Sequence, residues 1–108
     1  MVRQTWSRAA SVAELPEVEA LRRDYRIAFL RYLPKRDETA LALAYDIGRS
    51  SVADGTSVLV LTQVHHEILR EVVAESRPDE VDHLIERAAE FLAEVLASVE
   101  MIQRSLRG

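Results

Sequence analysis

The sequence predicts an all-α domain of four antiparallel helices, with a long fourth helix. Apolar residues recur at spacings of three and four in four separate segments, which is the period of amphipathic helices. Residues that start or end helices fall at the edges of these segments, namely Pro16, Pro34, Gly55 and Pro78. Only 3 Gly and 3 Pro occur among 108 residues, too few for the many turns of a β-sandwich, and the length suits one domain.

The first helix is predicted over about residues 16–33. Pro16 suits the first turn of a helix, and the acidic residues Glu17 and Glu19 are favourable near its positive end. Pro34 is expected to stop it. Residues 1–15 show no sustained period and are expected to form a flexible arm, leaving residues 16–108 as the four-helix domain. The predicted core stripe is Val18, Leu21, Tyr25, Ala28, Phe29 and Tyr32.

The second helix, over about residues 38–54, carries two apolar faces. Asp37 is a suitable N-cap, and Gly55 can supply a left-handed C-cap. The primary stripe comprises Leu41, Ala44, Tyr45, Gly48 and Val52. At 100° per residue, a second face comprises Ala40, Leu43 and Ile47. Because one core cannot easily use both faces, the second face is predicted to contact another chain.

The third and fourth helices are predicted over about residues 58–76 and from Pro78 to about residue 106. Thr56 or Ser57 caps the third helix, and acidic residues follow Pro78 in the first turn of the fourth. The fourth helix exceeds its neighbours by about two turns, so its C-terminal end is expected to project from the bundle. Its second face of mostly small residues is a candidate for dimer or partner contact and comprises Ala89, Ala93, Leu96 and Ala97.

Composition narrows the class of protein. The absence of cysteine excludes disulfides, thiolate catalysis and Cys-based zinc sites. No apolar run approaches the roughly 20 residues that span a bilayer, and no signal peptide is seen, so a cytoplasmic protein without a membrane partner is expected. The net charge of -4 argues against nucleic-acid binding. Residues 1–36 hold 8 basic and 4 acidic side chains, and the rest of the chain holds 6 basic and 14 acidic ones. This uneven distribution predicts a basic first helix beside acidic neighbours or, alternatively, a basic docking face.

The stretch "LTQVHHEILREVV" at residues 61–73 raises the possibility of histidine chemistry. His65 lies near the centre of the apolar stripe and is predicted to be a core residue. His66 lies at the boundary and is followed by Glu67, as in phosphoacceptor helices, but no proline follows and Arg70 is a poor substitute for the usual lysine. Phosphotransfer through His66 therefore remains the alternative to a non-enzymatic function.

The sequence contains no other pattern that indicates an active site. A di-metal bundle needs two Glu-x-x-His pairs, and the chain has one, Glu80 with His83. It has no glycine-rich phosphate loop, no G-x-S-x-G turn and no carboxylate pair in apolar surroundings. No enzyme activity, metal or cofactor is expected.

Three segments, in the same order along the chain, resemble a known family. They are "YRIAFLRYLPKRDETALALAYDIGRSSVADG", "VLTQVHHEILREV" and "AAEFLAEVLASVEMIQRSLRG". Over about residues 21–108 the chain resembles the N-terminal domain of RsbU-type stress-response phosphatases. The fold of that domain is also similar to the helical dimerisation domain of the clock protein KaiA.

The resemblance implies a cytoplasmic four-helix homodimer that serves as a docking platform. In that family a switch-type serine kinase binds the domain and activates the attached PP2C-like phosphatase, which dephosphorylates an anti-anti-sigma factor. The fourth helix is expected to relay partner binding to the effector. The partner-binding positions matching the family surface are Glu38, Ala42, Ala93 and Ala97. The dimer interface is expected to comprise Ala40, Leu43, Ile47, Ala89 and Leu96.

Overall fold

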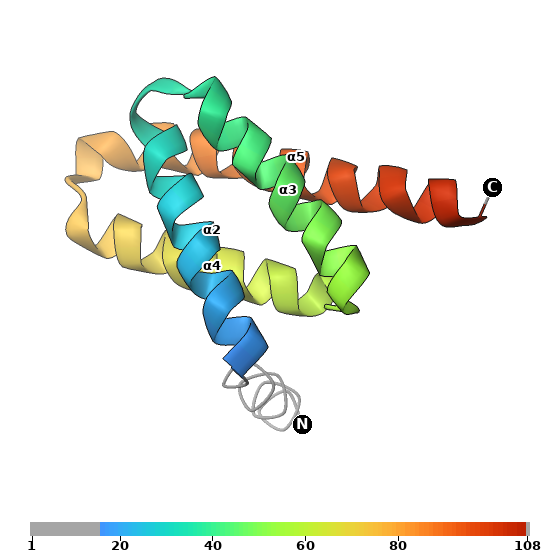
Figure 1. Cartoon of the computed structure of the whole chain (residues 1–108). Coiled ribbons are helices and arrows are strands. Elements are labelled where there is room, and N and C mark those ends of the chain that lie inside the picture. Colours follow the sequence, from blue (N-terminus) through green and yellow to red (C-terminus); the bar gives the residue numbers. More distant parts are fainter. Residues whose placement is uncertain (1–15, 108) are drawn as a thin grey trace.

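The computed structural model describes residues 16–107, and this part of the chain is helical throughout apart from short connections. Its elements are α2 (Pro16–Lys35), α3 (Glu38–Asp54), α4 (Val58–Glu75), the 3-10 turn η1 (Pro78–Glu80) and α5 (Val81–Arg107). Consecutive helices run in opposite directions, so α2 with α3 and α4 with α5 form two hairpins (Figure 1). The predicted all-α class is confirmed. The arm expected at residues 1–15 lies outside the described residues.

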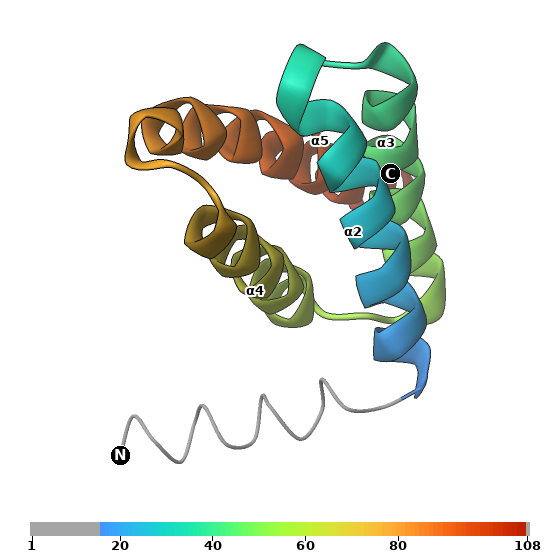
Figure 2. The ribbon, with the colours of Figure 1, turned by 90° about the vertical axis from the view of Figure 1, so that its left-hand side faces the viewer.

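The two hairpins lie across one another. Figure 2 shows the α4–α5 hairpin lying across one side of the α2–α3 pair. α3 and α5 make the most extensive contact, and α2 touches α3, α4 and α5. α5 is 27 residues long, and its C-terminal end extends beyond the other helices (Figure 1). As a result, Met101 and Leu106 near that end are 56% and 75% exposed.

Local signals in the sequence set most helix boundaries. The Asp37 carboxylate accepts a hydrogen bond from the Thr39 amide at 2.8 Å, and the Ser57 hydroxyl accepts one from the Val60 amide at 3.2 Å. Gly55 follows α3 with φ of 73°, the left-handed conformation that glycine adopts without steric cost. Pro34 does not stop α2, contrary to the prediction. Its fixed φ of about -65° suits a helical residue and its missing N–H removes a single intrahelical hydrogen bond, so α2 continues to Lys35 and ends before Arg36, which has φ of 49°.

An aromatic cluster forms the centre of the core. Tyr25 and Phe29 from α2 and Phe91 from α5 are fully buried. Phe91 meets the other two rings edge-on, with ring centroids 5.2 Å from Tyr25 and 5.5 Å from Phe29. The core around them consists of Val18, Ala28, Tyr32, Leu33, Ala40, Ala44, Ile47, Val60, Leu61, Val64, Ile68, Ala88, Val95 and Val99.

α3 uses both of its apolar faces in the fold of a single chain, so the prediction that one core would use only one of them is wrong. The physical reason is that α3 contacts α2 and α5 at once. Ala40 and Ile47, from the supposed free face, are 0% and 8% exposed, whereas Leu41 and Val52 from the other face are half-buried against the same core. Ala40 and Ile47 therefore present almost no surface to a second chain.

Gly48 allows α3 and α5 to approach closely. A Cβ atom at position 48 would lie 2.5 Å from the Val95 carbonyl oxygen and 2.6 Å from Ser98 Oγ. The Ser98 hydroxyl donates a hydrogen bond to the Tyr45 carbonyl oxygen at 2.7 Å, so the contact is both close and polar. The position of α5 against α3 thus depends on the absence of a side chain at residue 48.

Candidate interaction surfaces

The two adjacent histidines of α4 have different environments. His65 is buried, as predicted, and its Nδ1 lies 2.7 Å from the hydroxyl of Tyr25 on α2. Its ring also meets Tyr25 and Phe29 edge-on, with centroids 5.7 Å and 5.5 Å away. His65 is therefore a hydrogen-bonded member of the aromatic core.

Burial keeps both members of the Tyr25–His65 pair neutral near pH 7. Desolvation lowers the pKa of His65 to about 4, with a smaller effect from the positive charge that His66 can carry. Desolvation also raises the pKa of Tyr25. One hydrogen bond then joins a neutral phenol to a neutral imidazole, an arrangement that stabilises packing but supplies no charged group for catalysis.

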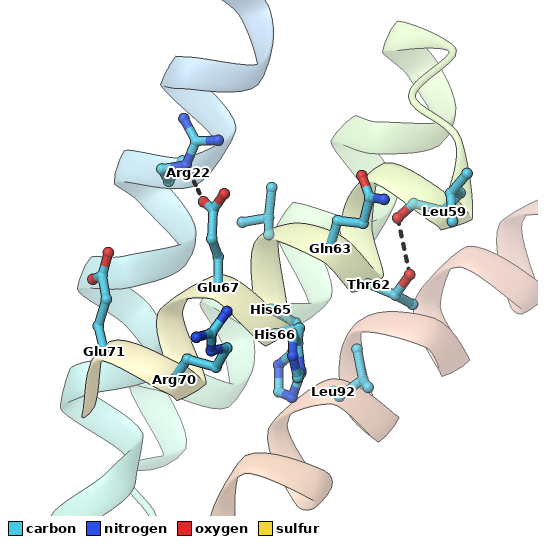
Figure 3. A pocket seen from close by; sticks show the side chains of 11 residues that line it. Arg22, Leu59, Thr62, Gln63, His65, His66, Glu67, Arg70, Glu71 and Leu92 are labelled. Atoms are coloured by element: carbon cyan, nitrogen blue, oxygen red, sulfur yellow. Dashed lines mark hydrogen bonds and ion pairs between the residues drawn. The ribbon is translucent and has the colours of Figure 1, made fainter. Parts of the chain in front are cut away.

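His66 is exposed and lines an open pocket of about 920 Å³ on the outer side of α4 (Figure 3). Its neighbours in the pocket include Arg70, Glu67 and Glu71 from α4, Arg22 from α2 and Leu92 from α5. The Glu67 carboxylate, which would assist a phosphoacceptor histidine, instead accepts a hydrogen bond from Arg22 Nε at 2.7 Å. The accessibility that phosphotransfer requires is present, but the neighbouring acid is engaged in an ion pair.

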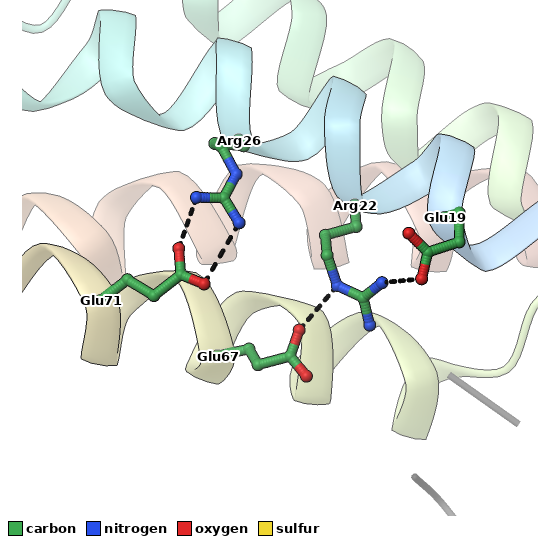
Figure 4. A network of polar contacts seen from close by, with 5 residues as sticks. All are labelled: Glu19, Arg22, Arg26, Glu67 and Glu71. Carbon is green, nitrogen blue, oxygen red and sulfur yellow. Dashed lines mark hydrogen bonds and ion pairs between the residues drawn. The ribbon is translucent and has the colours of Figure 1, made fainter. Parts of the chain in front are cut away.

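Ion pairs between α2 and α4 account for part of the uneven charge distribution. Arg22 bridges Glu67 and Glu19, with Nη1 2.5 Å from the Glu19 carboxylate (Figure 4). Arg26 pairs with Glu71 through both of its terminal nitrogens. These contacts place basic side chains of the first helix against acidic neighbours, as predicted. Because most of these groups are solvent-exposed, the ion pairs help to orient α2 relative to α4 but add little to the stability of the fold.

A second polar cluster joins the C-terminal end of α2 to α5. Glu90 accepts hydrogen bonds from Tyr32 Oη at 2.7 Å and from Arg36 Nε and Nη2 at 2.9 and 2.7 Å. The hydrogen bonds from Arg36 and then Tyr32 lower the pKa of Glu90 to about 2. Arg87 Nη1 donates to the Leu33 carbonyl oxygen at 2.9 Å, near the end of α2. This cluster fixes the position of α2 relative to α5.

The four positions expected to bind a partner are all exposed. Glu38 and Ala42 lie one turn apart at the start of α3, and Ala93 and Ala97 lie one turn apart on α5. Three of the four side chains are single methyl groups, so they allow close approach but supply little binding energy of their own.

The residues expected at a dimer interface separate into three groups. Ala40 and Ile47 are buried within the chain, as described above. Leu43 is half-buried beside α2 and belongs to a groove between α2 and α3. Ala89 is exposed and Leu96 half-buried, and both lie on one side of α5. These five residues do not form one surface.

Sequence reasoning missed Ile85, which extends the apolar side of α5. Ile85 is 49% exposed, and with Ala89, Leu92 and Leu96 it forms a row that we call the α5 side stripe. Their spacings of four, three and four residues match the a and d positions of a coiled coil. The sequence signal for this row is the recurrence of apolar residues at helical spacing from Ile85 to Leu96.

The described residues hold no group of three or more histidine and acidic side chains arranged to bind a metal. Glu80 and His83 are exposed at the start of the α5 region. Within residues 16–107, no helix is both long and apolar enough to cross a membrane.

Comparison with known proteins identifies the family. No curated protein and no solved structure matches the chain. The family model described as "Phosphoserine phosphatase RsbU, N-terminal domain" matches residues 23–101, which span most of α2, all of α3 and α4, and most of α5. The match covers well over half of the chain and includes all four helices that form the core. The chain belongs to the family of RsbU N-terminal domains, the regulatory domains of stress-response phosphatases.

Proposed function

We propose that this domain acts without enzyme activity of its own in bacterial stress and sigma-factor signalling. In the cytoplasm it docks a switch-type serine kinase or a similar signalling protein. It relays that binding through α5 to a PP2C-like phosphatase or another effector. The observation that carries the proposal is the form of α5: one helix of 27 residues takes part in the core and then extends beyond it.

The relay requires α5 to have two arrangements that a partner can distinguish. In this proposal two copies of the chain form a homodimer in which the α5 helices pair along the α5 side stripe, and the two arrangements differ in how these helices pair. Ala89 and Leu96 are then interface residues, as expected from the sequence, and Ile85 and Leu92 join them. A partner that binds one arrangement more tightly shifts the population towards it. A nearly complete switch needs a difference in binding free energy of roughly 5 kcal/mol between the two arrangements.

The positions expected to bind a partner on α3 and α5 support a link between partner binding and the arrangement of α5. Ala93 and Ala97 are exposed on the same helix that carries the side stripe. A partner bound over them, with Glu38 and Ala42 at the rim, would contact the relay helix directly. Small side chains there would let the partner's own larger side chains supply the binding energy.

Light scattering over a range of protein concentrations tests the dimer. The wild-type chain is expected to show a dimer mass, and Ala89→Glu and Leu96→Glu are expected to convert it to a monomer. Met101→Glu is the matched control, because Met101 is exposed on α5 but lies off the side stripe. A wild-type chain that stays monomeric at every concentration would refute the relay.

Calorimetry with a purified switch-type serine kinase tests docking. Ala97→Glu is expected to weaken binding at least tenfold, because a charged side chain would meet a desolvated surface. Ala74→Glu, which places the same change at an exposed position of α4, is expected to leave the affinity unchanged. Circular dichroism checks that both variants fold. Equal affinities for wild type and Ala97→Glu would remove this face from the docking surface.

Phosphotransfer through His66 is the second candidate, favoured by one observation, the exposure of His66. The engagement of Glu67 by Arg22 weighs against it. Incubation with a histidine kinase and labelled ATP separates the two functions. Acid-labile phosphate that forms on wild type but not on His66→Ala would favour phosphotransfer over the proposed docking function.

A further inference from the structure

A groove between α2 and α3 forms a surface separate from the docking positions and from the α5 side stripe. Its volume is about 300 Å³, and Leu21 and Ile27 on α2 and Leu43 and Ile47 on α3 supply its apolar floor. Ile27 is 52% exposed, and Leu30, one turn further along α2, is 47% exposed. Leu30 does not line the groove, but exposed aliphatic side chains in and beside a groove are typical of a protein-binding surface.

The rim of this groove is acidic. Glu17 and Asp24 line it from α2, and Asp46 and Asp54 line it from α3, while none of its described lining residues is a lysine or an arginine. Asp24 lies 3.4 Å from Arg23, and Asp46 lies 3.7 Å from Arg49. Both pairs are exposed and long, so they neutralise the rim only weakly.

We infer that the α2–α3 groove binds a basic amphipathic helix from another protein. The apolar floor suits the apolar face of such a helix, and the four carboxylates match lysine or arginine on both of its flanks. Between Glu17 and Ile27 the groove follows α2 for about 15 Å, the length of three helical turns. The inference concerns a site other than the proposed kinase surface and does not depend on it.

Charge selects this occupant over a second copy of the chain. An interface between two copies across this groove would bring four carboxylates of each copy towards those of the other, and like charges in an interface disfavour association. A basic helix has the opposite effect. Its binding should weaken as salt rises, because exposed charge pairs are screened within about 8 Å at physiological ionic strength.

A synthetic peptide provides the probe. It has 15 residues, with leucines along one helical face and lysines on both flanks, and a fluorescent label for anisotropy titration at low salt. One control peptide has the same composition with the leucines scattered over all faces. Another carries glutamate in place of lysine. The full chain is expected to bind the first peptide and to bind both controls at least tenfold more weakly.

Two pairs of protein variants locate the site, and within each pair the variant and its control have the same net charge. The double variant Asp24→Asn with Asp46→Asn removes two rim charges and is expected to weaken peptide binding about tenfold. The double variant Asp79→Asn with Asp82→Asn removes two exposed charges elsewhere and is expected to change binding less than twofold. Ile27→Ser tests the apolar floor in the same way, with Met101→Ser as its control. Circular dichroism confirms folding of each variant.

Several outcomes would overturn the inference. Equal losses in the two double variants would mean non-specific attraction to an acidic protein, and no binding at 1 mM protein would mean that no such site exists. Tighter binding after deletion of residues 1–15 would mean that the groove receives this chain's own N-terminal segment. Loss of peptide binding as the protein self-associates would identify a second copy as the occupant.

Discussion

The hydroxyl of Tyr25 on α2 lies 2.7 Å from Nδ1 of His65 on α4, inside the aromatic core. The pair joins α2 to α4 through residues 40 positions apart, and the Arg22–Glu67 and Arg26–Glu71 ion pairs join the same two helices at the surface. Both groups are buried, so the Tyr25 hydroxyl and His65 Nδ1 each provide the other with a hydrogen-bond partner away from water. The hydrogen bond therefore fixes how α4 lies along α2. Apolar side chains at these two positions would pack together without specifying that position.

Tyr25→Phe should destabilise the domain by about 1–3 kcal/mol, because it leaves Nδ1 of His65 buried without its partner. Urea denaturation at pH 7, followed by circular dichroism, measures the change in the free energy of unfolding. Tyr45→Phe is the control: Tyr45 is half-exposed, and the loss of its hydroxyl should cost no more than about 0.5 kcal/mol. Equal effects of the two substitutions would show that the Tyr25–His65 hydrogen bond does not stabilise the fold.

The buried imidazole should make stability depend on pH in the mildly acidic range. Burial lowers the pKa of His65 to about 4 from the ordinary 6.5, so the unfolded chain binds this proton more readily than the folded chain. The contribution of neutral His65 is complete above pH 6.5 and is lost as pH falls towards 4. The slope from this group approaches about 1.4 kcal/mol per pH unit.

Urea denaturation at several pH values between 7 and 4.5 measures this slope, and His65→Gln should reduce it. NMR titration of His65 in the wild-type chain provides a test that does not depend on the variant's stability. Half-protonation of His65 above pH 6 in the folded protein would contradict the expected dependence.

Glu90 should control acid unfolding in a separate, lower range. Hydrogen bonds from Arg36 and Tyr32 lower its pKa to about 2 from 4.5, so its stabilising contribution is present above pH 4.5 and is lost as pH falls towards 2. Glu90→Gln should raise the midpoint of acid unfolding, measured by circular dichroism between pH 5 and 2. Glu94→Gln, one turn further along α5, should shift the midpoint less. Identical midpoints for Glu90→Gln and wild type would refute the role of this cluster.

Helix boundaries could be predicted because their signals are local. Asp37, Gly55 and Ser57 act on backbone groups within four residues of themselves, so a short stretch of sequence specifies each helix end. The length of α5 followed from its uninterrupted apolar period in the same way. Pro34 misled the prediction because a proline removes one backbone hydrogen bond but keeps a φ that suits a helix, so α2 could continue for one more residue.

The surfaces could be predicted only in part, because burial on a helix depends on which helices it contacts. α3 lies against α2 and α5, and this arrangement buries Ala40 and Ile47, which periodicity alone had assigned to a free face. The inward position of His65 followed from its place in the stripe. Its partner Tyr25 could not be found, because the helical period fixes the direction of a side chain but not its neighbour.

Gly48→Ala should destabilise the domain although alanine is the better helix former. The new Cβ would lie 2.5 Å from the Val95 carbonyl oxygen, and moving the α5 backbone should cost about 1–3 kcal/mol beyond the propensity gain of roughly 1 kcal/mol. Combining it with Ser98→Ala should not restore stability, because the Val95 carbonyl remains in place. Gly55→Ala, where no atom lies within 4 Å, should cost only about 1–2 kcal/mol of left-handed strain. Thermal and urea unfolding measure both changes, and a Gly48→Ala variant more stable than wild type would show that α5 does not need this close approach.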